Sequence, residues 1–368
     1  MHNTTQSLTA IALQKFKKNF WGVFSFGYII VLIFISLFAY VLAPDNSENA
    51  NQMHLSINSK PPGFEVEMLV VPVDEKPTTS LSNYFFGFPN TVTEIPIKSY
   101  AIRGNTIEYE EYTNEPSLKI IKQLSLDRFS EVTDVKDIEM KFIRTQTFYL
   151  GTDKYGRDLL SRMLIGSRVS ISIGFVAVII SLVVGLFFGA IGGYFGGKTD
   201  ALVMWLVNII WSIPTLLLVI AITLALGKGF WQVFIAVGLT MWVEVARVVR
   251  GQVISVKEMQ YVTAARALGF SDFRIIFNHI LPNIMAPVIV ISAANFASAI
   301  LVESGLSFLG LGAQPPIPSW GSIIKDHYSY IILGKPYLAM VPGLAIMLLT
   351  LAFMMMGNAL RDALDVKE

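Results

Sequence analysis

Apolar and polar segments alternate along the chain on the length scale of a membrane. Six uncharged, strongly apolar runs cover residues 20–42, 169–193, 201–226, 230–243, 280–302 and 337–357. A helix rises 1.5 Å per residue, so about 20 apolar residues cross the roughly 30 Å of hydrocarbon in a bilayer. The pattern predicts an all-α integral membrane protein with six transmembrane helices.

The long segment between the first two apolar runs has the composition of a soluble domain. Residues 44–149 are charged, rich in Thr, Ser and Asn, and contain no run long enough to span a membrane. Within it, residues 95–102 and 106–112 flank the tight-turn pair Gly104-Asn105, which predicts a β-hairpin, and residues 64–73 alternate like a strand. We therefore expect three parts, namely residues 1–43 with the first span, a mostly β insertion at 44–149, and a core at 150–368. The pattern does not indicate what the insertion does.

Basic residues predict the orientation of the chain in the membrane. Lys15, Lys17 and Lys18 precede the first apolar run, and five Arg and Lys residues lie in the segment 244–274. Positive charge marks cytoplasmic loops, so we expect both termini in the cytoplasm and the insertion outside it. The first apolar run is longer than the 7–15 residues of a signal-peptide core, so we interpret it as a transmembrane helix rather than a signal peptide.

Composition narrows the function. The chain has 368 residues, 53% hydrophobic and 15% charged, against about 45–50% and about 25% in soluble proteins. The net charge of +1 gives no field that would attract nucleic acid, and the absence of Cys excludes disulfides and thiolate metal sites. No catalytic motif is present. A membrane enzyme that uses Glu303, His279 or Asp326 is disfavoured, because these residues are expected at different depths and on opposite faces of the bilayer.

A few small or polar residues interrupt the apolar runs. Gly185, Gly189 and Gly193 are spaced four apart, which predicts a helix-packing seam rather than a substrate contact. Polar side chains at membrane depth must face protein or a watery cavity. Asn208 and Ser212, beside Pro214, and Asn295 are therefore candidates for lining a pathway, with hydrogen bonding between helices as the alternative.

Charged residues gather just before the second apolar run. Asp153, Arg157, Asp158 and Arg162 stand at the membrane entry, where charges are costly unless they pair or face water. We expect a self-paired cap over the outer mouth, and a plain solvated loop is the alternative.

The polar stretch 258–282 separates two apolar runs and is patterned as two short helices joined by a bend. Tyr261, Ala264 or Ala265, and Leu268 recur with helical period, Gly269 supplies a helix stop, and Ser271 is a candidate N-cap for the second helix. Pro282 then bends the chain into the membrane. The small alanines beside a glycine allow another protein to approach the backbone closely.

This stretch resembles the cytoplasmic "EAA" loop of ABC-importer permeases. Ala264, Ala265, Gly269, Leu281 and Pro282 match in register, whereas Thr263 replaces the motif's Glu and His279 its Ile. Residues 151–162 resemble the GTDxxGRDxxSR signature, residues 306–321 the LSFLGLGxQPPxPSWG signature and residues 361–365 the RDALD signature of the C-type permeases of dipeptide and oligopeptide importers. The resemblance covers residues 150–368 strongly and the first span loosely, but not 44–149.

The resemblance implies a permease subunit with the type I importer fold in the cytoplasmic membrane of a bacterium. The implied partners are a sister permease, two ABC ATPase subunits and an extracytoplasmic solute-binding protein, with membrane lipid around the spans. ATP and Mg belong to the ATPase subunits, and this chain is expected to bind no cofactor and no metal. The implied ATPase-coupling residues, within the loop 244–282, are Glu258, Tyr261, Thr263, Ala264, Ala265, Leu268, Gly269, Phe270 and Pro282.

The cargo stays open. A dipeptide, a longer peptide, a nickel chelate or another solute all fit, because selectivity in this family rests largely with the binding protein. A channel or an exporter would keep the spans but needs neither an ATPase-docking loop nor a binding protein. Copurification from native membranes separates these readings, because ATPase subunits in the complex support the importer.

Overall fold

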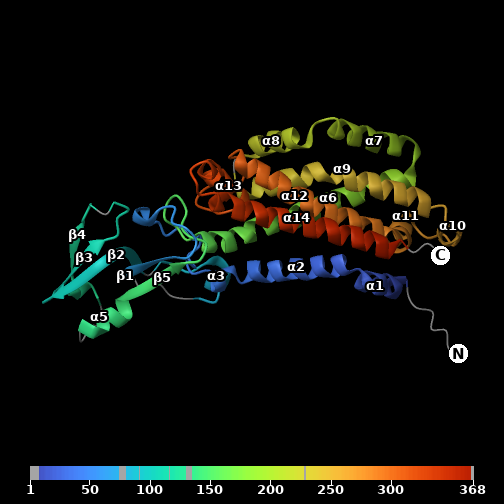
Figure 1. Ribbon diagram of the computed structural model, residues 1–368. Coiled ribbons are helices and arrows are strands. Elements are labelled where there is room, and N and C mark those ends of the chain that lie inside the picture. The colour runs from blue at the N-terminus through green and yellow to red at the C-terminus, as the bar shows by residue number, and fades with distance from the viewer. Residues whose placement is uncertain are drawn as a thin grey trace, which may run out of the picture. The chain divides into compact units, whose positions relative to one another are not determined.

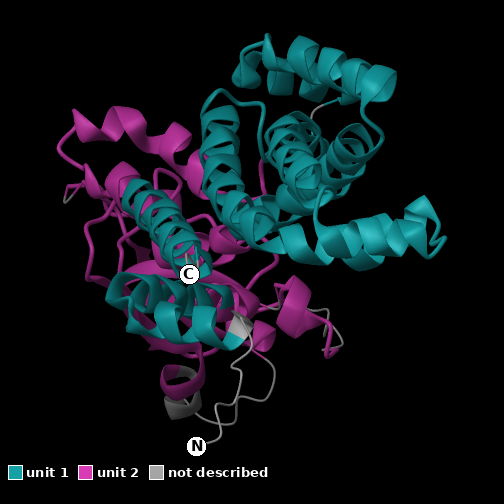
Figure 2. Cartoon of the chain, turned by 90° about the vertical axis from the view of Figure 1, so that its right-hand side faces the viewer, with its two compact units in different colours: residues 1–33, 169–314, 343–368 teal, residues 34–168, 315–342 magenta. Residues whose placement is uncertain are grey.

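A computed structural model describes residues 8–73, 80–90, 92–115, 117–129, 135–227 and 229–365. Residues 1–7 of the expected N-terminal segment and 366–368 of the expected tail lie outside the described residues. The chain divides into two compact units (Figure 2). The first contains residues 8–33, 169–314 and 343–365, and the second contains residues 34–168 and 315–342.

The first unit is helical. Five helical stretches in the described chain are long and apolar enough to cross a membrane, or six if one bent pair counts as a span. The helices, labelled in Figure 1, are α1 (Leu8–Lys18), α2 (Phe20–Leu37), α6 (Leu159–Phe195), α7 (Gly197–Trp211), α8 (Thr215–Leu226), α9 (Phe230–Val256), α10 (Gln260–Ala267), α11 (Asp272–Ile275), α12 (Met285–Phe308) and α14 (Tyr337–Leu364). Between α11 and α12 lie the π-helical turn η3 (Ile276–Ile280) and the 3-10 turn η4 (Leu281–Ile284).

The third span differs from its prediction as one continuous helix. The predicted run 201–226 is broken into α7 and α8, which are bent by 91°. Pro214 lacks a backbone N–H and disfavours helical geometry at Ile213, so α7 ends before this pair and α8 begins after it. With 15 and 12 residues, neither arm alone has the length of a straight span.

The packing seam predicted at the three glycines is confirmed. A Cβ atom added at Gly185 would lie 2.5 Å from Val245 Cβ, and one added at Gly189 or Gly193 would lie 2.8 Å from the Cβ of Val249 or Val253. These distances are shorter than any side chain tolerates. The glycines of α6 thus admit a valine row of α9 at every turn, which fixes the two helices side by side.

The second unit contains an antiparallel sheet of five strands in the order β4-β3-β2-β1-β5. The strands are β1 (Phe64–Pro72), β2 (Val92–Arg103), β3 (Thr106–Glu111), β4 (Ile121–Ser125) and β5 (Ile143–Phe148). The predicted hairpin is confirmed, with Arg103 opposite Thr106 in the β2–β3 register. Strand β1, which lies between β2 and β5, buries both faces, with Leu69 and Val71 in one cluster and Val66 and Met68 in another.

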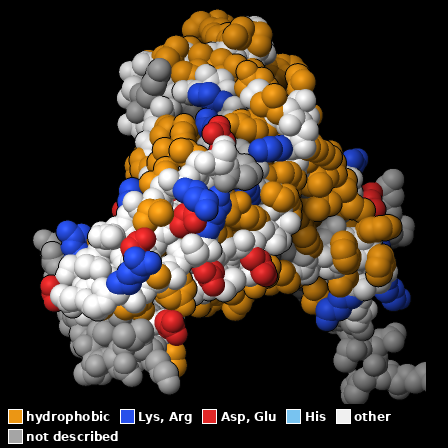
Figure 3. Space-filling model, turned by 60° about the vertical axis from the view of Figure 1, so that its left-hand side comes forward, with side chains coloured by type: hydrophobic (Ala, Val, Ile, Leu, Met, Phe, Trp, Pro, Cys, Tyr) orange, Lys and Arg blue, Asp and Glu red, His pale blue; other side chains and the backbone are white. Residues whose placement is uncertain are grey.

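Short helices complete the second unit. They are α3 (Ala39–Leu42), η1 (Leu55–Ile57), α4 (Asn83–Phe86), η2 (Leu126–Arg128), α5 (Val135–Phe142), α13 (Trp320–His327) and η5 (Tyr328–Ile331). The unit also includes the first turns of α6 and α14. On the face drawn in Figure 3, charged side chains gather in one part of the surface, while broad stretches elsewhere carry hydrophobic side chains.

Candidate functional site

The helix α10 ends in a glycine cap that the sequence predicts. Gly269 has a φ of +77°, the left-handed geometry that glycine adopts without strain. The Gly269 N–H donates to Arg266 O at 3.0 Å, and the Phe270 N–H donates to Ala265 O at 3.2 Å. These two bonds form a Schellman motif, which turns the chain sharply after one short helix.

The two alanines of α10 lie on different faces. Val262 and Ala265 are buried, at 0% and 4% exposure, whereas Tyr261, Ala264 and Leu268 are exposed. Successive helical residues are about 100° apart, so Ala264 and Ala265 cannot share one narrow face. The predicted face is corrected accordingly. Ala265 belongs to the inward face, and the outward face is formed by Tyr261, Ala264 and Leu268.

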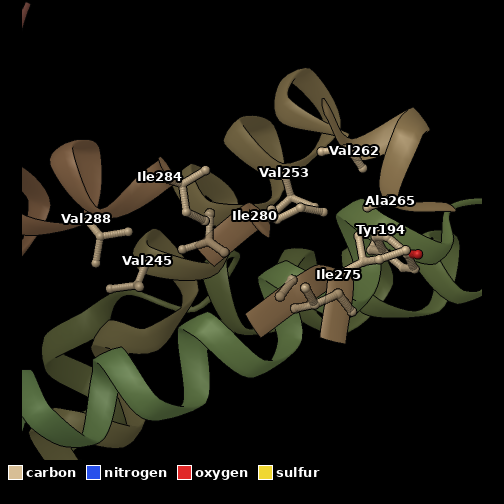
Figure 4. Packing of buried hydrophobic residues seen from close by; sticks show 12 residues of the cluster. Tyr194, Val245, Val253, Val262, Ala265, Ile275, Ile280, Ile284 and Val288 are labelled. Carbon is tan, nitrogen blue, oxygen red and sulfur yellow. The ribbon is translucent and has the colours of Figure 1, made fainter. Parts of the chain in front are cut away.

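The inward face of α10 rests on a buried hydrophobic cluster that joins several helices (Figure 4). Val262 and Ala265 pack in the same cluster as Val253 of α9 and Ile284 of η4. The other buried members are Ala190, Tyr194, Val245, Val249, Ile275, Ile276, Ile280 and Val288. The cluster connects α10 to α6, α9 and α12.

The rest of the stretch 258–282 divides in the same way. Glu258, Thr263 and Pro282 are exposed, whereas Phe270 packs against the buried cluster and stacks on His279 with ring centroids 5.8 Å apart. The N-cap position of Ser271 is as predicted, but its side chain accepts no capping hydrogen bond. Asp272 instead accepts a hydrogen bond from the Tyr194 hydroxyl at 2.5 Å.

An ion pair that sequence reasoning missed braces the same end of the first unit. Arg250 of α9 binds both carboxylate oxygens of Asp200 at the start of α7, with Nη2 2.6 Å from Oδ2. Such bidentate geometry fixes orientation as well as distance. The residues are 50 positions apart, so no local pattern could have paired them.

The charged motif at residues 151–162 is buried. Asp153 is wholly inaccessible, and Arg157 and Arg162 are 4% exposed. Arg157 Nε donates to Asp153 Oδ2 at 2.7 Å, and its Nη2 makes an ionic contact of the same length that is poorly aligned for a hydrogen bond. Arg162 Nε lies 3.7 Å from that oxygen. Asp153 thus pairs with the arginines of its own motif, while the role of the motif as a cap over an outer mouth stays a prediction.

Asp158 differs from the expected pairing, because it forms no ion pair within the described chain. Its Oδ2 accepts from the Ser161 N–H at 2.8 Å and from the Ser161 hydroxyl. Burial raises the pKa of Asp158, an effect that the Ser161 hydrogen bonds oppose. The Ser161 N–H and O–H groups thus serve Oδ2 in place of an arginine, whereas Oδ1 is buried and has no hydrogen-bond partner in the described chain.

The motif binds the chain segment 45–60, a role that the sequence analysis did not foresee. Ser161 Oγ accepts from the Asp45 N–H at 2.8 Å, Thr152 Oγ1 accepts from the Lys60 N–H at 2.8 Å, and Arg157 Nη1 donates to Asn51 Oδ1 at 2.8 Å. The only indication in the sequence was that the motif contains Thr152 and Ser161, whose hydroxyl groups can bind a backbone N–H. Their partners lie about a hundred positions away, in a segment that the motifs recognised in the sequence do not cover.

The motif also contacts α13 through a histidine. His327 is 1% exposed, its Nδ1 lies 2.8 Å from Ile323 O, and its Nε2 accepts from the Lys154 N–H at 3.3 Å. These partners require a neutral ring with the proton on Nδ1, and burial lowers the pKa of His327 accordingly. Ser319 caps the N-terminus of α13. Trp320, the first residue of this helix, donates its indole N–H to Met163 O at 3.0 Å.

The three candidate pathway residues are not brought together by any described contact. Asn208 and Ser212 are exposed, and the Ser212 hydroxyl donates to Ile209 O at 2.7 Å. Asn295 is 1% exposed, and neither of its amide atoms has a hydrogen-bond partner in the described chain. A cavity of about 200 Å³ lies at the α7–α8 bend, lined by other residues that include Thr215, Thr240, Glu244 and Ser298. The pathway role of the three stays a prediction.

The sequence matches two protein-family models. The family described as "Binding-protein-dependent transport system inner membrane component" matches residues 164–367. A second family, "N-terminal TM domain of oligopeptide transport permease C", matches residues 7–62. Among the described residues, no group of three or more His, Asp or Glu side chains is arranged to hold a metal ion.

The matched region covers most of the length of the individual relatives. A dipeptide transport system permease protein of Alkalihalophilus pseudofirmus is 42% identical over 219 residues, which are 60% of this chain and 72% of that protein. A glutathione transport system permease protein of Pectobacterium atrosepticum is 38% identical with the same coverage. A chain of the MetNI methionine ABC transporter aligns with a TM-score of 0.46 and 18% identity, over 55% of this chain and 95% of that one. This chain therefore belongs to the binding-protein-dependent transport system inner membrane components, the permease family of ABC importers.

Proposed function

We propose that this chain is the permease subunit of an ATP-driven importer for dipeptides or short oligopeptides. The relatives that are named for their cargo carry dipeptides, oligopeptides or glutathione, a tripeptide-sized molecule. The proposed complex adds a sister permease, two ATPase subunits that bind ATP and Mg, and an extracytoplasmic solute-binding protein. It lies in the cytoplasmic membrane.

The observation that supports the proposal best is the two-faced helix α10. Its outward face exposes two large hydrophobic residues, Tyr261 at 44% and Leu268 at 74%, on either side of the small Ala264. Its inward face is packed into the cluster of α6, α9 and α12. A partner that binds the outward face would therefore move the ends of three membrane helices together, because close-packed interiors transmit displacement rather than absorb it.

Coupling is tested by enlarging the outward face without touching the cluster. Ala264→Trp fills the space between Tyr261 and Leu268, and Gly269→Leu forces a branched residue to a φ of +77°, a strain of about 1–2 kcal/mol. We expect normal membrane insertion but reduced ATPase association or reduced substrate-stimulated ATP hydrolysis. Thr263→Glu, at an exposed position, is the matched control and should be tolerated.

The outcome decides between coupling and mere linkage. If complexes that contain Ala264→Trp or Gly269→Leu both hydrolyse ATP at the parental rate in response to substrate, the stretch 258–282 only connects two helices. Copurification of ATPase subunits with the parental chain supports the importer, whereas a chain that purifies alone favours the channel or exporter alternative.

The topology belongs to the proposal as well. We place both termini in the cytoplasm, count the bent α7–α8 pair as the third of six spans, and place residues 44–149 outside, where they influence docking of the binding protein. Asn90 is exposed, and the chain has no Cys of its own. A single Asn90→Cys variant should react with a membrane-impermeant thiol reagent in intact cells. Reaction only after permeabilisation contradicts this orientation.

The cargo is tested in proteoliposomes that contain the complex and its binding protein. Uptake of a labelled dipeptide, pentapeptide and glutathione is compared at equal concentrations. We expect ATP-dependent uptake of at least one peptide. Uptake of a nickel chelate alone would contradict the peptide assignment while leaving the coupling mechanism intact.

A further inference from the structure

A short apolar segment of the second unit is exposed although it is firmly held. Leu81 is 82% exposed, and Tyr84, Phe85 and Phe86 around α4 are 49%, 52% and 71% exposed. Single exposed apolar side chains are common on protein surfaces, but four large ones within six residues form a patch that calls for an occupant.

The patch is fixed to the chain that follows the first span. The Phe88 N–H donates to Asn46 O at 3.0 Å, and Ser47 and Phe88 form a β-bridge. Gly87 lies so close to Glu48 that an added Cβ would be 2.4 Å from its Cα. These backbone contacts leave the patch little freedom to turn its aromatic side chains inward.

This anchoring places the patch at a membrane boundary. The first apolar run ends at Leu42 in α3, against which α4 packs, and the polar residues Asp45 and Asn46 follow directly. The transition from apolar to polar sequence at the end of a span marks the lipid headgroup region. The segment 81–86 is bonded to this transition, so it lies at the same depth.

The chemistry of the patch fits that depth. Aromatic side chains are enriched at membrane interfaces, where the ring contacts acyl chains and a hydroxyl such as that of Tyr84 reaches the headgroups. A second exposed apolar pair of this unit, Ile332 and Leu333 at 91% and 67%, stands just before α14, at the start of another span. Both exposed patches thus share one property, which is adjacency to the end of a membrane helix.

We propose that residues 81–86 form an interfacial anchor that inserts Leu81, Tyr84, Phe85 and Phe86 into the lipid bilayer beside the first span. Such segments lie about 5–10 Å deep at the boundary between headgroups and acyl chains. The anchor ties the β-sheet unit to the membrane surface. The anchor would lie in the outer leaflet of the bilayer, and this choice of leaflet alone rests on the topology proposed above. The insertion into lipid requires no more than that residues 20–42 span the bilayer.

The test measures depth directly. The chain lacks Cys, so Phe86→Cys and, separately, Leu81→Cys carry a nitroxide label in the full complex, reconstituted in bilayers of phosphatidylethanolamine and phosphatidylglycerol. The control is Lys119→Cys, an exposed polar position of the same unit. Collision rates with oxygen, which concentrates in lipid, are compared with those of a water-soluble nickel chelate.

We expect oxygen collisions to dominate at positions 81 and 86 and nickel collisions to dominate at position 119. Nickel collisions dominating at 81 and 86 would show that the segment faces water. Protection from both reagents would show that a protein partner covers it. Either result overturns the anchor, and neither bears on transport activity or on the side of the membrane, which the Asn90→Cys labelling reports independently.

Discussion

The motif at residues 151–162 leads from β5 into α6, and the stretch 258–282 leads from α9 toward α12. Their matched residues have opposite relations to solvent. The motif buries Asp153, Arg157 and Arg162 and places both arginines in ionic contact with the one carboxylate. The stretch 258–282 keeps Ala264 and Gly269 on the surface, with open space around the glycine. A resemblance in sequence therefore marks two different things here, an internal clamp and an exposed surface that we propose is completed by a partner.

The largest expected effect breaks the internal clamp. Asp153→Asn leaves Arg157 and Arg162 buried without their counterion, and breaking a buried pair costs about 3–5 kcal/mol. The control is Asp326→Asn, which removes a partly exposed pair with Lys154 worth about 0–1 kcal/mol. Thermal unfolding of the purified complex should show a large shift for the first variant only. Equal shifts would mean that the buried charges are dispensable.

Two glycines with almost the same backbone sharpen the comparison. Gly156 and Gly269 have φ values of +74° and +77°, so alanine adds about 1–2 kcal/mol of backbone strain at either. At Gly156 the new Cβ would also meet His54 O at 1.8 Å, whereas at Gly269 nothing lies within 4 Å. Overpacking adds about 1–3 kcal/mol or more at Gly156 alone. Limited proteolysis and thermal unfolding should rank Gly156→Ala as clearly the more damaging, and the reverse order would refute the clamp.

The adjacent alanines of α10 provide the next test. Ala265→Leu places three extra carbon atoms in the buried cluster, at a cost of about 1–3 kcal/mol, while Ala264→Leu adds them on the surface. Thermal unfolding should separate the two variants, although they change the same residue type one position apart. Similar losses of stability would mean that α10 is not mounted on the cluster as described.

The smallest expected effect is a change of stability with pH, caused by His327, which contacts the buried motif at residues 151–162. His327 is held neutral with a pKa below its ordinary 6.5, so the folded protein binds fewer protons than the unfolded chain. Its contribution to stability is therefore present above pH 6.5 and is lost as the pH falls below that value. Asp153, Asp326 and Lys154 are the charged groups that act on it.

The measurement compares thermal unfolding at about pH 8 and about pH 5.5 for the parental chain and His327→Gln. Glutamine keeps a donor and an acceptor but does not titrate. Subtracting the two pH responses removes the contribution of Asp158, whose raised pKa acts in the opposite direction. An identical pH response in both proteins would show that His327 does not titrate with unfolding.

The sequence predicted what depends on periodicity and local geometry. Apolar length located the membrane helices, the Gly104-Asn105 turn located a hairpin, and Gly269 located a helix end. It could not predict contacts between distant segments, such as Asp200 with Arg250 or Ser161 with Asp45. Such pairs depend on how the elements pack, and nothing near either residue encodes its partner.

The sequence was also misleading where one residue overrides a pattern. The apolar run 201–226 has the length of a span, yet Pro214 divides it, because a missing N–H outweighs the helix-forming tendency of its neighbours. Likewise, counting Ala264 and Ala265 as one helical face ignored the 100° between successive residues.

The first and last strands of the sheet are neighbours, with Phe64 opposite Phe148. The segment between these two residues therefore begins and ends at adjacent positions. The distance between its two ends does not depend on how many residues the segment contains. An engineer could replace residues 65–147 with a short turn or with another folded module, provided that 44–63 stay to hold the motif at 151–162. Natural variation can lengthen or shorten this part of the chain in the same way, while the helices that cross the membrane keep their sequence and their spacing.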